Sequence, residues 1–271
     1  MNELSRIVAA TREAVAERRR EVPEDAVRAV AARRPDGDVR GFREALARPG
    51  LSLIAEHKRR SPSAGVIRDG VLLGDVVGAY EAGGASALSI LTEGPSFGGS
   101  LEDLRAARAA AKLPILRKDF IVDRYQVAES SAWGADAILL IVAALPEGEL
   151  VSLHELARSH GLAALVEIHD ERELEVAIRV GAAIIGINNR DLTTLEVDTR
   201  RTYELLPGIP PGTIVVAESG FRERSELEKL RRAGVDAVLV GEALMRSEDI
   251  ETACRALARP DRSLSSASRQ P

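Results

Sequence analysis

The chain has 271 residues and is poor in cysteine and in long apolar segments. Its one cysteine, Cys254, excludes an internal disulfide and suits a reducing compartment, so we expect buried packing for Cys254 and a cytoplasmic protein. The longest apolar run, residues 137–145, is too short to span a membrane, and the N-terminal segment lacks the apolar stretch of a signal peptide. With a net charge of −5, the chain also lacks the basic surface that nucleic-acid binding needs. Neither a membrane nor a nucleic-acid partner is therefore expected.

Patterns that bind metal ions are also missing. The four histidines, His57, His154, His160 and His169, do not show the spacing of metal ligands, and no cysteine cluster accompanies them. Isolated histidines of this kind are usually structural. We therefore expect neither a metal ion nor an organic cofactor.

Lysine is scarce, with four lysines among 37 basic residues. Lys112 and Lys229 lie near the ends of predicted helices, where chance is a sufficient explanation. Lys58 and Lys118 instead close apolar runs typical of strands. Because a lysine changes its pKa readily and can exchange its proton, whereas arginine stays charged, Lys58 and Lys118 are candidate catalytic residues.

Four segments repeat one pattern, in which a glycine and a small residue precede a short apolar run. They are residues 83–90, 134–141, 181–188 and 234–241. Glycine at this place is typical of a helix C-cap that leads into a buried strand. With the apolar runs before and between them, these segments predict strands at 51–57, 87–92, 113–118, 137–142, 162–168, 183–188, 213–218 and 236–241. Helical patterns fill the gaps at 75–82, 101–112, 124–134, 147–161, 171–181 and 222–234.

Apolar strands that alternate with helices indicate a parallel sheet covered on its outer face. Eight such units predict an α/β fold of the (β/α)8 or TIM-barrel type. A doubly wound open sheet is the alternative, but no G-x-G-x-x-G fingerprint follows the first strand. Residues 1–48 predict an N-terminal helical extension, which belongs to a single domain over residues 1–259. Residues 260–271 are rich in serine and predict a disordered C-terminal tail.

Polar side chains at the C-terminal ends of the strands should converge at one mouth of such a barrel. In chain order these strand ends carry Glu56, Lys58, Lys118, Glu167, Asn188, Arg190, Glu218, Ser219, Gly241 and Glu242. Carboxylates and lysines in a mouth of low dielectric would shift each other's pKa values, as acid/base catalysis requires. The alternative is a structural network of ion pairs that closes the barrel.

A phosphate site is expected in the loops after the seventh and eighth strands. Ser219-Gly220 and Gly241 lie there, and their backbone N–H groups can approach and bind an anion. Arg60, in a turn-rich segment after the first strand, could add a cation. Two of the few aromatic residues, Phe97 and Phe120, would either stack on a planar ligand or fill the mouth.

At these positions the chain resembles the indole-3-glycerol phosphate synthases of tryptophan biosynthesis. The matching stretches include IAEHKRRSPS (54–63), LRKDFIVDRYQVAES (116–130), GINNRDLTTLEVD (186–198) and VAESG (216–220). The resemblance runs from about residue 39 to 258 and implies a cofactor-free barrel enzyme that acts on a small sugar phosphate. The implied reaction closes a ring in 1-(2-carboxyphenylamino)-1-deoxyribulose 5-phosphate, releasing CO2 and water and forming indole-3-glycerol phosphate.

The resemblance also implies roles for individual residues. Lys118 would be the general acid at the ketone, and Glu167 would carry the proton transfers of dehydration. Lys58 would pair with the substrate carboxylate or share the acid role, while Glu56 and Asn188 orient these groups. The phosphate would contact Ser61, Ser219, Gly220 and Gly241, and the aromatic ring Phe97, Phe120 and Leu139. Arg60, Arg190, Leu239 and Glu242 complete the substrate-binding set that we expect.

Two positions depart from the family pattern. Glu242 stands where a small residue is frequent beside the phosphate, so its side chain should turn away; Ser96 replaces a bulkier residue near the ring.

Three other functions are alternatives to this one. A phosphoribosylanthranilate isomerase would need a cysteine at the first strand, where Glu56 and Lys58 stand instead. The other rivals are a Schiff-base aldolase that uses Lys118 and a non-catalytic barrel that binds a phosphometabolite. We expect a monomer, with a homodimer as the alternative.

Overall fold

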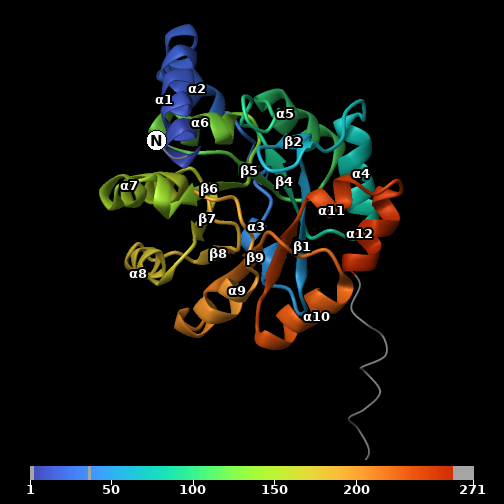
Figure 1. The fold of residues 1–271 in the computed structure, drawn as a ribbon. Coiled ribbons are helices and arrows are strands. Elements are labelled where there is room, and N and C mark those ends of the chain that lie inside the picture. The colour runs from blue at the N-terminus through green and yellow to red at the C-terminus, as the bar shows by residue number, and fades with distance from the viewer. Residues whose placement is uncertain (1–2, 36–37, 259–271) are drawn as a thin grey trace, which may run out of the picture.

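The structure is a computed structural model that describes residues 3–35 and 38–258. Within these residues, eight parallel strands close into a barrel in the order β1-β10-β9-β8-β7-β6-β5-β4 (Figure 1). Their bounds are β1 (Ser52–His57), β4 (Ala87–Leu91), β5 (Ile115–Lys118), β6 (Ala137–Ile141), β7 (Ala163–Ile168), β8 (Ile184–Asn188), β9 (Ile214–Glu218) and β10 (Ala237–Val240). The TIM-barrel prediction is thus confirmed, and each barrel strand lies within a predicted one.

Helices alternate with the strands and cover the barrel from outside (Figure 1). They are α4 (Leu73–Gly83), α5 (Leu101–Ala110), α6 (Arg124–Ala132), α7 (Glu147–Ser159), α8 (Glu171–Arg179), α9 (Arg200–Leu205), α10 (Arg224–Ala233), α11 (Glu242–Met245) and α12 (Ile250–Ala258). Two 3-10 turns, η1 (Val142–Ala144) and η2 (Leu206–Gly208), and a small antiparallel hairpin of β2 (Arg60–Ser61) and β3 (Gly65–Val66) complete the elements. Across the described ranges, none of the helices has the length and apolarity needed to cross a membrane.

The N-terminal extension forms α1 (Glu3–Glu21), α2 (Glu24–Ala31) and α3 (Phe42–Leu46) before β1 begins. Helix α1 buries Ile7, Thr11 and Val15, whose four-residue spacing places them on one face of the helix. Helix α2 packs against α6 on the side of the barrel (Figure 1). The expected tail, residues 260–271, lies outside the described residues.

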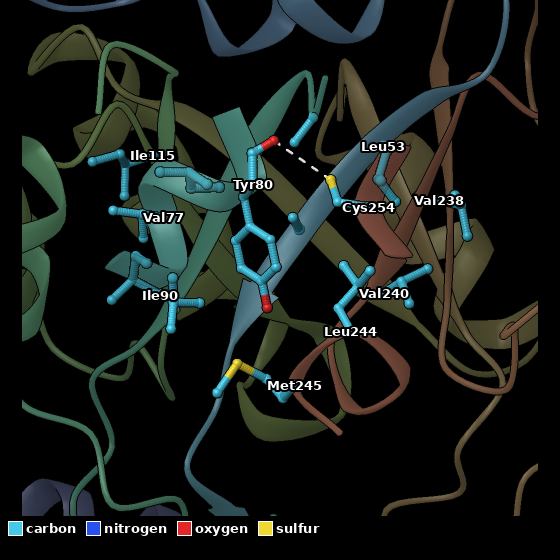
Figure 2. Close-up of a cluster of buried hydrophobic side chains, with 14 of the residues drawn as sticks. Leu53, Val77, Tyr80, Ile90, Ile115, Val238, Val240, Leu244, Met245 and Cys254 are labelled. Atoms are coloured by element: carbon cyan, nitrogen blue, oxygen red, sulfur yellow. Dashed lines mark hydrogen bonds between the residues drawn. The ribbon is translucent and has the colours of Figure 1, made fainter. Parts of the chain in front are cut away.

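A large part of the core fills the space between the barrel and helices α4 and α12 (Figure 2). Tyr80 of α4 is fully buried there, and its hydroxyl donates to the backbone oxygen of Glu56 at 2.9 Å. The thiol of Cys254 is buried as expected and donates to the backbone oxygen of Tyr80 at 3.4 Å (Figure 2). Packing and hydrogen bonding between the barrel and these helices thus fix the position of β1, the strand that carries Glu56.

Candidate active site

Four ionisable side chains enter the barrel mouth from alternate strands. Glu56 lies on β1, Lys118 ends β5, Glu167 lies on β7 and Glu218 ends β9. Alternate strands of a TIM barrel point side chains into the same layer of the interior, which explains why these four residues meet. The Lys118 Nζ atom lies 2.9 Å from Glu167 Oε2 and 3.2 Å from Glu218 Oε2. The strand between the two carboxylates, β8, carries Gly186, where any Cβ atom would collide with Oε1 of Glu218.

The charges in this layer shift each other's proton affinities. Burial lowers the pKa of Lys118, but Glu167, Glu218 and Glu56 outweigh it and raise this pKa well above its usual range. Burial raises the pKa of Glu167, while Lys118 and His169 overcome it and hold this pKa below the ordinary value. For Glu218, burial and the charge of Glu167 prevail over Lys118 and raise the pKa to about 7. The mouth therefore pairs a firmly ionised carboxylate with one that holds a proton near neutral pH, the pattern of an acid/base site.

The raised pKa of Glu218 predicts a pH-dependent cost in stability. The unfolded chain releases this proton near pH 4.5 and the folded chain near pH 7, so ionised Glu218 destabilises the fold as pH rises between them. Near pH 4.5 we expect Glu218→Gln to have the same free energy of unfolding as the wild type. At pH 8 its free energy of unfolding should be higher by up to about 3 kcal/mol, since one pKa unit corresponds to about 1.36 kcal/mol. Urea unfolding across this pH range measures the difference. The exposed control Glu155→Gln should show no such trend, and a Glu218→Gln curve parallel to the wild type would contradict the prediction.

A short chain of hydrogen bonds orients Glu167. The amide of Asn188 donates to Glu167 Oε1 at 3.1 Å, and the hydroxyl of Ser219 donates to Asn188 Oδ1 at 2.9 Å. The backbone N–H of Arg190 donates to the same Asn188 oxygen at 3.0 Å. Ser219 has φ +63°, a left-handed conformation that is uncommon outside glycine. Backbone strain of this kind is typical of functional sites.

Glu56 and Lys58 form a further ion pair of the mouth. The Lys58 Nζ atom lies 2.9 Å from Glu56 Oε1, and the Ser89 hydroxyl donates to Glu56 Oε2 at 3.3 Å. Gly241 follows the neighbouring strand β10, and a Cβ atom there would lie 2.6 Å from Glu56 Oε1. Glycine at 241 therefore leaves room for the Glu56 carboxylate.

One side of the mouth is aromatic. Phe97 and Phe120 lie with ring centroids 6.4 Å apart and planes tilted by 36°. They line a cavity together with Ser61 and with Leu4 and Ile7 of α1. The N-terminal extension thus forms part of the wall of the predicted site.

The opposite side of the mouth is lined by backbone and polar groups. Ser219, Gly220, Gly241 and Glu242 border a cavity of about 330 Å³ there. Gly220 has φ +92°, which only glycine adopts without strain. The carboxylate of Glu242 is bound by Arg246 Nε at 3.0 Å, and that this side chain turns away from a phosphate stays a prediction.

These two sides join into one groove across the mouth. Lys58 and Arg190 line the aromatic cavity, the glycine-lined cavity and a central cavity between them. The central cavity is walled by Leu139 and Leu239 and contains the four-residue ionisable layer. A ligand with an aromatic end and an anionic end would fit this arrangement.

Arg60 stands apart from the other predicted site residues. Its guanidinium donates to the backbone oxygens of Gly94 at 3.0 Å and Pro95 at 3.1 Å. It therefore holds the loop between β4 and α5, and that Arg60 supplies a cation for the phosphate stays a prediction. The cations that line the glycine side are Lys58, Arg190 and Arg222.

Sequence reasoning gave no role to two residues that the structure places in or beside this layer. Glu218 ends a predicted strand, directly before Ser219. Because side chains alternate in direction along a strand, this position is a signal for an inward side chain. His169 was interpreted as an isolated structural histidine. Its partners come from a neighbouring helix and from its own strand, which the spacing of histidines alone does not reveal.

Comparison with known proteins agrees with this geometry. Residues 4–257 match the family model described as "Indole-3-glycerol phosphate synthase". A protein of that name from Kineococcus radiotolerans is 48% identical to this chain, over 92% of this chain and 92% of its own length. Another from Rhizorhabdus wittichii is 47% identical, over 94% of this chain and 98% of its own length.

The chain belongs to the indole-3-glycerol phosphate synthase family. Its activity is accordingly that of an indole-3-glycerol phosphate synthase, a carboxy-lyase of tryptophan biosynthesis. Solved structures of more distant proteins share the barrel alone. A thiamine phosphate pyrophosphorylase and a tryptophan synthase complex, both from Pyrococcus furiosus, align with TM-scores of 0.58 and 0.57 at 19% and 18% identity. The alignments span 76% and 77% of this chain, and 93% and 98% of the pyrophosphorylase and tryptophan synthase chains.

Proposed function

We propose that the groove binds 1-(2-carboxyphenylamino)-1-deoxyribulose 5-phosphate lengthwise, with Lys118 at the reacting ketone. The observation that supports this most directly is the position of Lys118. It lies between two carboxylates of different proton affinity, in the central cavity that shares Lys58 and Arg190 with both the aromatic and the glycine-lined cavity. The anthranilate ring lies against Phe97, Phe120 and Leu139. The phosphate lies at the glycine side, near the backbone of Ser219-Gly220 and Gly241, with Arg190 as a neighbouring cation.

Ring closure then begins with proton donation from Lys118. The aryl carbon that bears the carboxylate attacks the ketone carbon, and the ketone oxygen takes the Lys118 proton to become a hydroxyl. Lys58 exchanges its pairing with Glu56 for the substrate carboxylate until the C–C bond to that carboxylate breaks and CO2 leaves. The first step develops negative charge on the ketone oxygen, where the Lys118 ammonium already lies, and stabilisation of this kind is usually the largest electrostatic contribution to catalysis.

Dehydration completes the ring and uses the carboxylates. The Glu167 carboxylate removes a proton from the ring carbon adjacent to the carbon that bears the new hydroxyl. Glu218 can hold a proton near neutral pH and is the candidate to protonate that hydroxyl as it leaves as water. Asn188 and Ser219 keep Glu167 in place through their hydrogen bonds.

The purified chain should form a fluorescent indole product from this substrate without any added cofactor. Among residues 3–35 and 38–258, the acidic, histidine and cysteine side chains form no group able to hold a metal ion. We therefore expect exhaustive chelation to leave the rate unchanged. Loss of activity that one metal ion restores would refute the cofactor-free reaction. Borohydride trapping with the substrate tests the aldolase rival, because only a Schiff base on Lys118 would leave a covalent adduct.

Three organisational features belong to the same proposal. A single domain over residues 1–259, a cytoplasmic location and a monomer, with a homodimer as the alternative, follow from the sequence expectations. Sedimentation of the purified chain decides between monomer and dimer.

A further inference from the structure

His169 lies beside the proposed base of the dehydration step. It follows β7 two residues after Glu167, so both side chains leave the strand on the same face. The imidazole Nε2 atom lies 3.4 Å from Glu167 Oε1, and the side chain is only 11% exposed. An imidazole in this place acts on Glu167 directly.

Glu173, in the first turn of α8, fixes the orientation of the imidazole. One carboxylate oxygen of Glu173 accepts from the backbone N–H of His169 at 2.7 Å and lies 3.0 Å from its Nδ1 atom. Glu173 is itself anchored, because its backbone N–H donates to Asp170, the N-cap residue of α8, at 2.9 Å. The ring therefore presents Nδ1 to one carboxylate and Nε2 to another.

This arrangement decides which protonation state of His169 suits the site. Nδ1 faces a carboxylate at hydrogen-bond distance and must carry a proton there. Nε2 is buried and has no hydrogen-bond partner among the described residues, although Glu167 Oε1 is its neighbour. In a neutral ring, the Nε2 lone pair would repel that carboxylate, whereas a second proton makes the contact attractive.

We propose that His169 is a positioning residue, a protonated imidazolium between Glu173 and Glu167 that keeps Glu167 ionised and correctly oriented. The proposal rests on the proposed role of Glu167 in dehydration. It gives the second oxygen of Glu167 a cationic partner, as Lys118 does for the first. Glu167 is then a carboxylate at the start of each dehydration step.

The groups around the imidazole favour its charged form. Burial lowers the pKa of His169, but the hydrogen bond to Glu173 and the charges of Glu167, Glu173 and Glu218 raise it above the ordinary value. Asp191, in the loop after β8, adds a further negative charge near it. Lys118, which lies on the other oxygen of Glu167, and Arg201, which also acts on Asp191, are the opposing charges in this region.

Nitrogen-15 NMR of the histidine rings tests the protonation state without reference to activity. We expect the His169 signal, assigned by its loss in His169→Gln, to titrate above pH 6.5, the ordinary histidine value. Glu173→Gln should lower the pH at which the His169 ring titrates, while the exposed α8 control Glu175→Gln should leave it unchanged. A His169 ring that is neutral at pH 6.5 in the wild type would overturn the proposal.

The pH profile of turnover tests the effect on Glu167. His169→Gln keeps an amide N–H near the place of Nε2 but removes the charge, so the pKa of Glu167 should rise. We expect the acid limb of the kcat profile to move up by about one pH unit, with little change in KM. The matched control His160→Gln, after α7, should leave the profile unchanged. An equal fall in kcat at every pH, or an acid limb that does not move, would contradict the proposal. Full activity of Glu167→Gln would instead refute the role of Glu167 and leave the NMR result standing.

Discussion

Lys118→Arg should lower turnover by roughly 10²–10⁴-fold, the usual contribution of general acid catalysis, while substrate binding changes far less. Arginine would preserve the charge between Glu167 and Glu218 but would not release a proton to the ketone oxygen. The planar guanidinium is also larger than the ammonium, which fits within 2.9 Å and 3.2 Å of the two carboxylates. Phosphate and aromatic contacts lie at the two ends of the groove, so affinity should be retained.

Lys58→Arg is the matched control for that experiment. The proposed task of Lys58 is to pair with a carboxylate, for which arginine is also suited. It should therefore keep more turnover than Lys118→Arg. Steady-state kinetics of both variants, with a direct measurement of substrate binding, compares them. Turnover near that of the wild type in Lys118→Arg would exclude the acid role and leave Lys58 as the better candidate.

The barrel was predictable because its strands are buried on both faces. Most of each strand is apolar, helical patterns separate the strands, and a glycine with positive φ follows α4, α6, α7, α8 and α10, so local sequence was sufficient. The smallest elements were not predictable in the same way. The two-residue strands β2 and β3 and the four-residue helix α11 are too short for any periodicity to develop.

The site was predictable to the extent that strand ends determine position. Glu56, Lys118 and Glu167 meet because alternate strands direct them into one layer. Side-chain direction in loops is a different matter, because it depends on partners that lie far away in the chain. Arg60 binds carbonyl oxygens 34 and 35 residues away, and no local pattern indicates that. The pairing of His169 with Glu173 likewise became visible only once α8 was placed beside β7.

Asp136 received no role from the sequence, yet it is the anchor between the N-terminal extension and the barrel. Its side chain is fully buried, and it binds Arg34 Nη2 at 2.8 Å and Arg108 Nη1 at 2.8 Å. It also accepts from the backbone N–H groups of Arg40 and Ile115 at 2.8 Å and 2.9 Å. Arg34 and Arg40 belong to the extension, whereas Arg108 and Ile115 belong to α5 and β5. Asp136 thus pairs with cations from both sides of this junction, and Asp38 pairs with the same two arginines at 2.7 Å and 2.9 Å.

Asp136→Asn should therefore lower the free energy of unfolding by about 1–3 kcal/mol, because Asp38 still pairs with Arg34 and Arg108 while buried donors lose their charged acceptor. Because α1 lines the aromatic side of the groove, looser attachment of the extension should also raise KM. Urea unfolding and steady-state kinetics measure the two effects.

Glu149→Gln provides the control, since the Arg12–Glu149 pair also joins the extension to the barrel. That pair is exposed, at 45% and 46%, and an exposed pair contributes about 1 kcal/mol or less. Equal stability of Asp136→Asn and Glu149→Gln would contradict the prediction, because the buried network would then add nothing beyond a surface pair.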